Sequence, residues 1–198
     1  AKALPYAAAT AITTGVAPLL FVQVLYGQFF YSSSILMAVP WLAIVGILTI
    51  AYYGLYVNAF RAGADRPMRT RIAWGSSALL VIVGLLYTSN IALMLAPERW
   101  ADAYAPHGLN PQITLASLAR YAHVLVGALA VSGAFVVAYG LFARRTCAEY
   151  GSWVVRSGAL VVTAATAAQV TFGPAFLFSL PESSRRLFLG ADGLATSL

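Results

Sequence analysis

Long stretches without charge dominate the pattern of polar and apolar positions along the chain. No Asp, Glu, Lys or Arg occurs from Ala3 to Phe60, and further uncharged runs cover Ile72–Pro97, Tyr121–Ala143 and Ser157–Pro181. Each run is longer than the ~20 residues that a helix needs to cross about 30 Å of hydrocarbon. Backbone amides inside a bilayer must be paired internally, and no run alternates with the period of two typical of a barrel strand. The pattern therefore predicts an all-α fold, a polytopic membrane helix bundle.

Turn residues and charges divide this bundle into five transmembrane helices, which we expect to form a single domain over residues 1–198. Ser32–Ser34 separates two helices within the first run, and Gly63, Asp65 and Pro67 mark the next loop. The closing segment Leu187–Leu198 has the character of the start of a sixth helix, so we expect the sequence to belong to a longer protein. The predicted helices cover about 6–31, 35–60, 72–96, 113–142 and 153–180.

The connection 97–112 is long enough to carry structure of its own. Pro97 suits the first turn of a helix, Trp100 and Tyr104 are typical of a bilayer surface, and Asn110–Pro111 suits the start of the following helix. We expect a short interfacial helix here, which serves either as a lid over a site or as a plain connector.

Composition agrees with a membrane protein and excludes a soluble globule. The chain is 61% hydrophobic and 9% charged, with a mean hydropathy of +0.80, whereas soluble domains carry about 25% charged residues. The net charge of +6 does not indicate nucleic-acid binding, because most arginines lie at predicted helix ends, where they set topology. The single cysteine, Cys147, excludes an internal disulfide.

The distribution of cations predicts the orientation. With the N-terminus cytoplasmic, eight cations lie inside and four outside, which favours this topology and places the connection 97–112 outside. The inner set is Lys2, Arg61, Arg66, Arg69, Arg71, Arg144, Arg145 and Arg156, and the outer set is Arg99, Arg120, Arg185 and Arg186.

Polar residues inside the spans are the candidates for chemistry, because each is costly unless it has a partner or a function. No carboxylate or lysine lies within a predicted span, which disfavours an ion-coupled carrier or a channel. Polar side chains instead gather in the predicted outer halves, where they indicate either a ligand pocket or interhelical hydrogen bonding. They are Gln23, Tyr26, Gln28, Tyr87, Ser89, Asn90, His123, Gln169 and Thr171.

His123 is the most informative of these residues, because it is the only histidine in a span. Its helical face continues through Gly127, Ala130, Ala134 and Ala138, and such a stripe leaves room for another helix or for a flat macrocycle. Imidazole is a common axial ligand of haem iron, so His123 is a candidate ligand of haem b. Contact with a quinone and ordinary packing remain open alternatives.

A second haem ligand and a propionate partner can also be named. Met94 and Met37 lie at a compatible predicted depth, and His107 in the outer connection is the other histidine. Arg120 lies one turn before His123, where it either neutralises a propionate or extends to the bilayer surface. The chain has no CxxCH motif, which excludes covalent c-type haem.

A quinone site is the second cofactor hypothesis. An apolar slot with a few donors suits a quinone ring, and Gln28, Asn90 and His123 are the candidate donors. The aromatic residues equally suit an interfacial belt. They are Tyr26, Phe29, Phe30, Tyr31, Trp41, Tyr87 and Phe172.

These residues favour an integral membrane subunit of a bacterial electron-transfer complex of respiratory type, cytochrome b-like, in the inner (cytoplasmic) membrane. In general character the chain is similar to membrane subunits of bacterial respiratory complexes, although no motif carries this likeness. Its partners would be the lipid bilayer and other membrane and extracytoplasmic subunits, and it would be at most one subunit of a membrane oxidoreductase. The alternative is a cofactor-free structural or assembly subunit that packs against other subunits.

Overall fold

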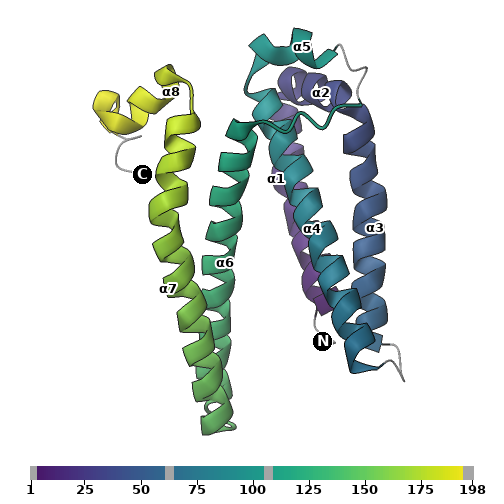
Figure 1. The fold of residues 1–198 in the computed structure, drawn as a ribbon, viewed down its shortest axis with the longest axis vertical. Coiled ribbons are helices and arrows are strands. Elements are labelled where there is room, and N and C mark those ends of the chain that lie inside the picture. The colour runs from purple at the N-terminus through teal and green to yellow at the C-terminus, as the bar shows by residue number, and fades with distance from the viewer. Residues whose placement is uncertain (1–3, 61–64, 105–108, 194–198) are drawn as a thin grey trace. The chain divides into compact units, whose positions relative to one another are not determined.

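The computed structural model describes residues 4–60, 65–104 and 109–193, and most of these are helical, with no strand among them. The all-α fold is thus confirmed (Figure 1). The chain divides into two compact units, Ala1–Thr114 (unit 1) and Leu115–Leu198 (unit 2), and each is described by itself.

Five of the described helices are long and apolar enough to cross a membrane. Their outward faces carry large apolar side chains, such as Phe21, Val24 and Leu115, at 70%, 82% and 83% exposure. So much exposed apolar surface is unfavourable in water but not in the hydrocarbon of a lipid bilayer. The helices therefore indicate a multi-pass membrane protein. The candidate spans are Pro5–Leu25, Ala38–Phe60, Arg66–Met94, Leu115–Ala143 and Ala148–Ser179.

Unit 1 contains three of these long helices and two shorter helices at one end. The long helices are α1 (Leu4–Leu25), α3 (Ala38–Phe60) and α4 (Arg66–Met94). Between α1 and α3 lies α2 (Gly27–Leu36), and after α4 come the 3-10 turn η1 (Pro97–Arg99) and α5 (Trp100–Tyr104). Figure 1 shows α2 and α5 at the same end of the unit.

The first predicted helix, 6–31, is divided in the structure. Tyr26 leaves the helical region (φ −126°, ψ 31°), and α2 then continues through Ser32–Ser34, the segment predicted as a turn. The serines are compatible with a helix because Ser33 Oγ lies 2.9 Å from the Phe30 carbonyl oxygen and can donate to it. The break falls instead at Met37 (φ −114°, ψ 31°), three residues before Pro40, which belongs in a first turn because it lacks an N–H.

The short helix α5 is anchored to the rest of unit 1 by one aromatic side chain. Trp100 Nε1–H donates a 3.0 Å hydrogen bond to the Leu93 carbonyl oxygen, and the indole packs against Phe29 at 5.9 Å between ring centroids. Below it, Met37, Leu93 and Ala103 form a fully buried apolar cluster. Helical turns therefore close this end of the unit.

Unit 2 is a helical hairpin of α6 (Leu115–Ala143) and α7 (Ala148–Ser179), which lie side by side in Figure 1. Glycines let the two backbones approach closely. A Cβ on Gly133 would lie 3.0 Å from the backbone nitrogen of Val162, and one on Gly158 would lie 2.9 Å from that of Val137. Close backbone approach through small residues is a main source of helix association in membranes.

The segment predicted to begin a sixth helix follows α7 as short turns. These are α8 (Glu182–Arg186) and the π turn η2 (Leu187–Ala191), which contains Gly190 at φ 111°. A positive φ suits glycine and interrupts the helix. The end of the predicted segment, residues 194–198, lies outside the described residues.

Candidate functional site

Polar side chains of α6 and α7 meet toward the end of unit 2 that leads into α8. Gln169 Nε2 on α7 donates a 2.9 Å hydrogen bond to the backbone oxygen of His123 on α6. Gly127, one turn after His123, makes room for this amide, because a Cβ there would lie 3.2 Å from Gln169 Nε2. Gly127, the first small residue after His123 on this face of α6, therefore leaves room for the Gln169 amide.

The His123 ring lies against the last turns of α7. It stacks on Phe176 with 5.4 Å between centroids and an angle of 22° between planes. A Cβ on Gly173 would lie 3.9 Å from both Cε1 and Nδ1 of the ring, so the α7 backbone approaches the imidazole at ordinary contact distance. These contacts fix the ring plane and bury Nδ1.

Two polar atoms in this cluster are buried without a hydrogen-bond partner, His123 Nδ1 and Gln169 Oε1. Such atoms are rare in folded proteins and cost about 1–3 kcal/mol each. The pair is chemically complementary, since an imidazole nitrogen that carries a proton donates and an amide oxygen accepts. Of the two ring nitrogens, Nδ1 is therefore the one buried without a partner.

Arg120 joins the cluster through the same aromatic ring. Its guanidinium carbon lies 5.3 Å from the centroid of the Phe176 ring, a cation–π distance. Arg120 and His123 thus both contact Phe176, from positions one turn apart on α6. We call Arg120, His123, Gln169, Gly173 and Phe176 the His123 cluster.

Two further stripe residues of α6, Ala134 and Ala138, are exposed, whereas the α7 interface runs through Gly133 and Gly140. At 1.5 Å per residue these alanines lie about 16 Å and about 22 Å along the helix from His123, so they do not line a group held by its ring. Of the features that a haem ligand needs, the cluster supplies the histidine and a nearby cation, Arg120. The described residues contain no group of three or more His, Cys, Asp or Glu that could hold a metal ion by themselves.

The predicted site residues of unit 1 lie in different surroundings. Asn90 on α4 is fully buried against α2, where its Oδ1 lies 3.3 Å from Ser33 Oγ and its Nδ2 lies 3.5 Å from Ser34 Oγ. This amide therefore links α2 to α4. Gln28 on α2 is exposed and takes no part in the link. Next to Asn90, Ser89 Oγ is buried without a partner.

The candidate sulfur ligands are buried within unit 1. Met94 is 7% exposed and lines a cavity of about 230 Å³ together with Tyr26, Phe29, Leu95 and Pro97. Met37 is fully buried in the apolar cluster beneath Trp100. The prediction for His107 lies outside the described residues.

An apolar cavity of about 440 Å³ lies between α1, α3 and α4. Its lining is aliphatic apart from Phe30 and Tyr87. Trp41 contacts both of these rings, edge to face with Phe30 at 5.7 Å and tilted against Tyr87 at 5.1 Å between centroids. Gly15 and Pro18 of α1 also line it. Of the aromatic residues predicted for a quinone pocket, Phe30 and Tyr87 are therefore the two that reach this space.

Phe176 has no signal in the sequence, and only the packing of α7 on α6 brings it to the imidazole. Gly173 precedes Pro174, and this pair predicts a break in the last helix, but α7 continues through both residues to Ser179. Gln169 does carry a signal, as a polar residue at the predicted depth of His123.

Comparisons of the chain with protein-family models, with curated proteins and with solved structures found no match.

Proposed function

We propose that the chain is a membrane subunit of an electron-transfer complex of respiratory type, in which His123 ligates haem b through Nε2. The observation that carries this proposal is the pair of buried, unpartnered atoms, His123 Nδ1 and Gln169 Oε1. A histidine that binds a metal through one nitrogen keeps its proton on the other, and that N–H almost always donates to a carbonyl, a carboxylate or water. Gln169 carries such an oxygen on the facing helix, and in the proposal it takes this proton on ligand binding, since the two atoms are not hydrogen-bonded to each other in the structure.

The other residues of the His123 cluster suit the same role. Phe176 and Gly173 hold the ring plane against α7, so the imidazole is oriented before any ligand arrives. The Arg120 guanidinium lies over the Phe176 ring, where it would supply positive charge to a haem propionate. Haem, when bound, would supply one-electron transfer, and the chain would supply its ligand and surroundings.

A partner subunit would supply the second ligand, while Met94, Met37 and His107 stay predictions, since both methionines are buried within unit 1 and His107 lies outside the described residues. We further propose a bacterial inner membrane, with the N-terminus cytoplasmic and an extracytoplasmic redox partner. The eight-to-four distribution of cations supports this orientation.

Quinone binding is the closest alternative within an electron-transfer complex. It is favoured by the apolar cavity of about 440 Å³ in unit 1, whose volume and lining suit an isoprenoid-like chain or ring with the Tyr87 phenol at one wall. In this case the chain would still belong to an electron-transfer complex, but it would be colourless when purified alone.

A cofactor-free packing subunit is the candidate from a different class. The exposed alanines Ala134 and Ala138 favour it, because small residues on a lipid-facing helix allow a further helix to pack closely. Such a subunit would leave His123 as a packed residue whose ring is held by Phe176.

The haem content of the purified protein tests the proposal. Wild type, His123→Ala and a control variant, Gln23→Ala, are purified in detergent and assayed as pyridine haemochrome. Gln23 is a half-buried polar residue of α1 in unit 1 and belongs to no cluster described above. We expect haem b in wild type and in Gln23→Ala and its loss in His123→Ala, whereas a wild type without haem contradicts the cytochrome proposal.

A further inference from the structure

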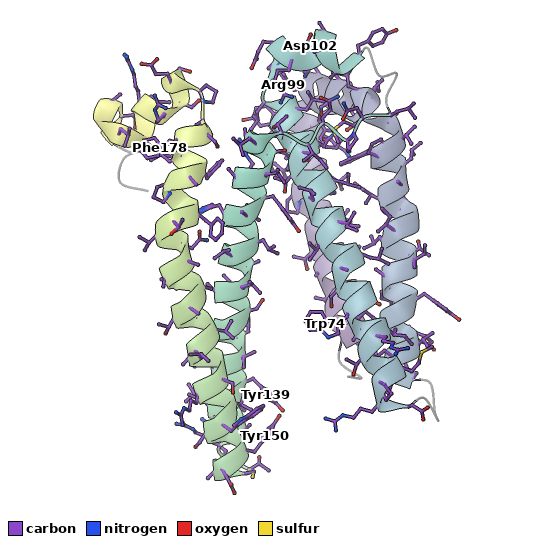
Figure 2. All side chains as sticks on the ribbon, in the orientation of Figure 1. Trp74, Arg99, Asp102, Tyr139, Tyr150 and Phe178 are labelled. Atoms are coloured by element: carbon purple, nitrogen blue, oxygen red, sulfur yellow. The ribbon has the colours of Figure 1, made fainter. Side chains whose placement is uncertain are left out.

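A basic cavity of about 590 Å³ lies where α3 ends and α4 begins, within unit 1. Its volume falls within the range of about 300–1,000 Å³ that is typical of ligand sites. Figure 2 labels Trp74 near this end of α4, away from Arg99 and Asp102 at the other end of the unit. The polar and aromatic lining residues are Asn58, Arg66, Arg69, Thr70, Trp74 and Ser77.

Arg69 is held in place by the end of α3. Its NH2 group donates a 2.8 Å hydrogen bond to the Asn58 carbonyl oxygen, and its Nε lies 3.5 Å from Asn58 Oδ1. A guanidinium has five N–H donors in a rigid fork, so two contacts to Asn58 leave further donors unused. The half-buried Arg69 therefore presents an oriented cation to the cavity.

No carboxylate within the described ranges 4–60, 65–104 and 109–193 forms an ion pair with Arg66 or Arg69. Among the residues that the structure describes, the salt bridge found joins Arg186 to Glu182 in unit 2, and neither Arg66 nor Arg69 takes part in one. Asp65 precedes Arg66 in the chain and pairs with neither. The Thr70 hydroxyl donates to the Arg66 carbonyl oxygen at 3.0 Å, so the guanidinium groups are the principal donors available in the cavity.

We propose that this cavity binds an anionic phosphate group, presented either by a lipid headgroup or by a free phosphate. Two uncompensated arginines match phosphate oxygens, which guanidinium groups bind in a bidentate manner. Trp74, at 74% exposure, places an amphipathic indole at the end of a membrane span, where headgroups lie. Basic pockets at the ends of transmembrane helices are a known form of acidic-lipid recognition. The site is separate from the His123 cluster and independent of its role.

Quenching of Trp74 fluorescence tests this site in the full chain. The protein is reconstituted in phosphatidylcholine vesicles, which are then supplemented with brominated phosphatidylglycerol or, for comparison, brominated phosphatidylcholine. The Trp74 signal is the difference between each protein and the same protein carrying Trp74→Phe. Inorganic phosphate, added without brominated lipid and then in competition with it, distinguishes a free phosphate from a headgroup.

Arg66→Gln is the informative variant, because the Arg66 side chain is exposed and makes no described hydrogen bond that the fold would lose. Arg71→Gln is the matched control, since Arg71 lies on the same helix and does not line the cavity. Losing a charge-assisted hydrogen bond weakens binding about tenfold. We therefore expect Arg66→Gln to raise the half-saturating amount of phosphatidylglycerol, or of phosphate, about tenfold, while Arg71→Gln resembles wild type.

Three results would overturn the proposal. One is equal binding by Arg66→Gln and wild type, and another is an equal loss in Arg71→Gln, which would reveal diffuse attraction of anions to the whole end of the unit. The third is equal quenching by the two brominated lipids with no response to inorganic phosphate. Arg66→Lys, which keeps the charge, and circular dichroism of every variant exclude a loss of fold as the cause.

Discussion

At the scale of single residues, the polar side chains of the spans fall into two kinds. Asn90 has its hydrogen bonds provided by Ser33 and Ser34 of a neighbouring helix, as expected of a residue that holds helices together. His123 and Gln169 each keep one buried atom without a partner. Because both kinds are equally polar in the sequence, hydropathy alone could not separate them.

Gln169→Ala tests whether this amide supports a ligating imidazole. We expect haem affinity to fall about 10–100-fold, because the proposal makes Gln169 the acceptor of the second ring proton, and loss of such an acceptor weakens metal ligation by this factor. A haem titration of the detergent-purified variant measures the effect. Unchanged affinity in Gln169→Ala would assign the amide to packing of α7 on α6 alone.

Asn90→Ala tests whether an amide whose hydrogen bonds are satisfied holds α2 and α4 together. Hydrogen bonds between membrane helices contribute about 0.6–2 kcal/mol, and the free energy of unfolding should fall by this amount. Denaturant unfolding in detergent, followed by circular dichroism, gives the value. The exposed Gln28→Ala is the control and should leave stability unchanged, whereas equal losses would remove the distinction between the two amides.

At the scale of helices, composition and charge spacing were enough to predict the number of long helices, while backbone detail was not. The run from Ala3 to Phe60 is uniformly uncharged, so nothing in it marked Tyr26 as a break or the serines as helical. The close approach of α6 and α7 depends on which of several glycines face each other. Which glycines face each other is determined by the packing of the two helices, and the helix propensity of each segment does not reveal it.

Gly133→Val tests that close approach. The added side chain meets the Val162 backbone, so we expect a loss of about 1–3 kcal/mol in the free energy of unfolding, the usual effect of overpacking. Gly75→Ala on α4 is the control, because its Cβ would meet nothing within 4 Å. Unfolding in detergent compares the two, and a neutral Gly133→Val would mean that the hairpin readily separates.

At the scale of the whole molecule, the apolar outer faces indicate a multi-pass membrane protein, and the distribution of cations predicts its orientation. Both properties can be predicted from the sequence, because the length of each apolar segment and the charges that flank it determine insertion and topology without reference to tertiary contacts. The basic cavity between α3 and α4 had no comparable signal, since its arginines were read as topology determinants. Only the hydrogen bonds from Arg69 to Asn58, and the lack of a paired carboxylate in the part of the chain that the structure describes, distinguish it.

Cys147 offers a direct test of the orientation, because it is the single cysteine of the chain and is exposed. With the N-terminus cytoplasmic, it lies in the cytoplasmic connection between α6 and α7. A membrane-impermeant maleimide should therefore label inverted vesicles and spare intact spheroplasts. Labelling of the spheroplasts from outside would reverse the proposed topology.

The most direct test of the central claim is the dithionite-reduced minus oxidised visible spectrum of wild type, His123→Ala and Gln23→Ala at equal protein concentration. Ligation of haem b by His123 predicts b-type absorption bands in wild type and in Gln23→Ala and their loss in His123→Ala. A spectrum without such bands in wild type, or bands that persist in His123→Ala, would contradict haem ligation at the His123 cluster.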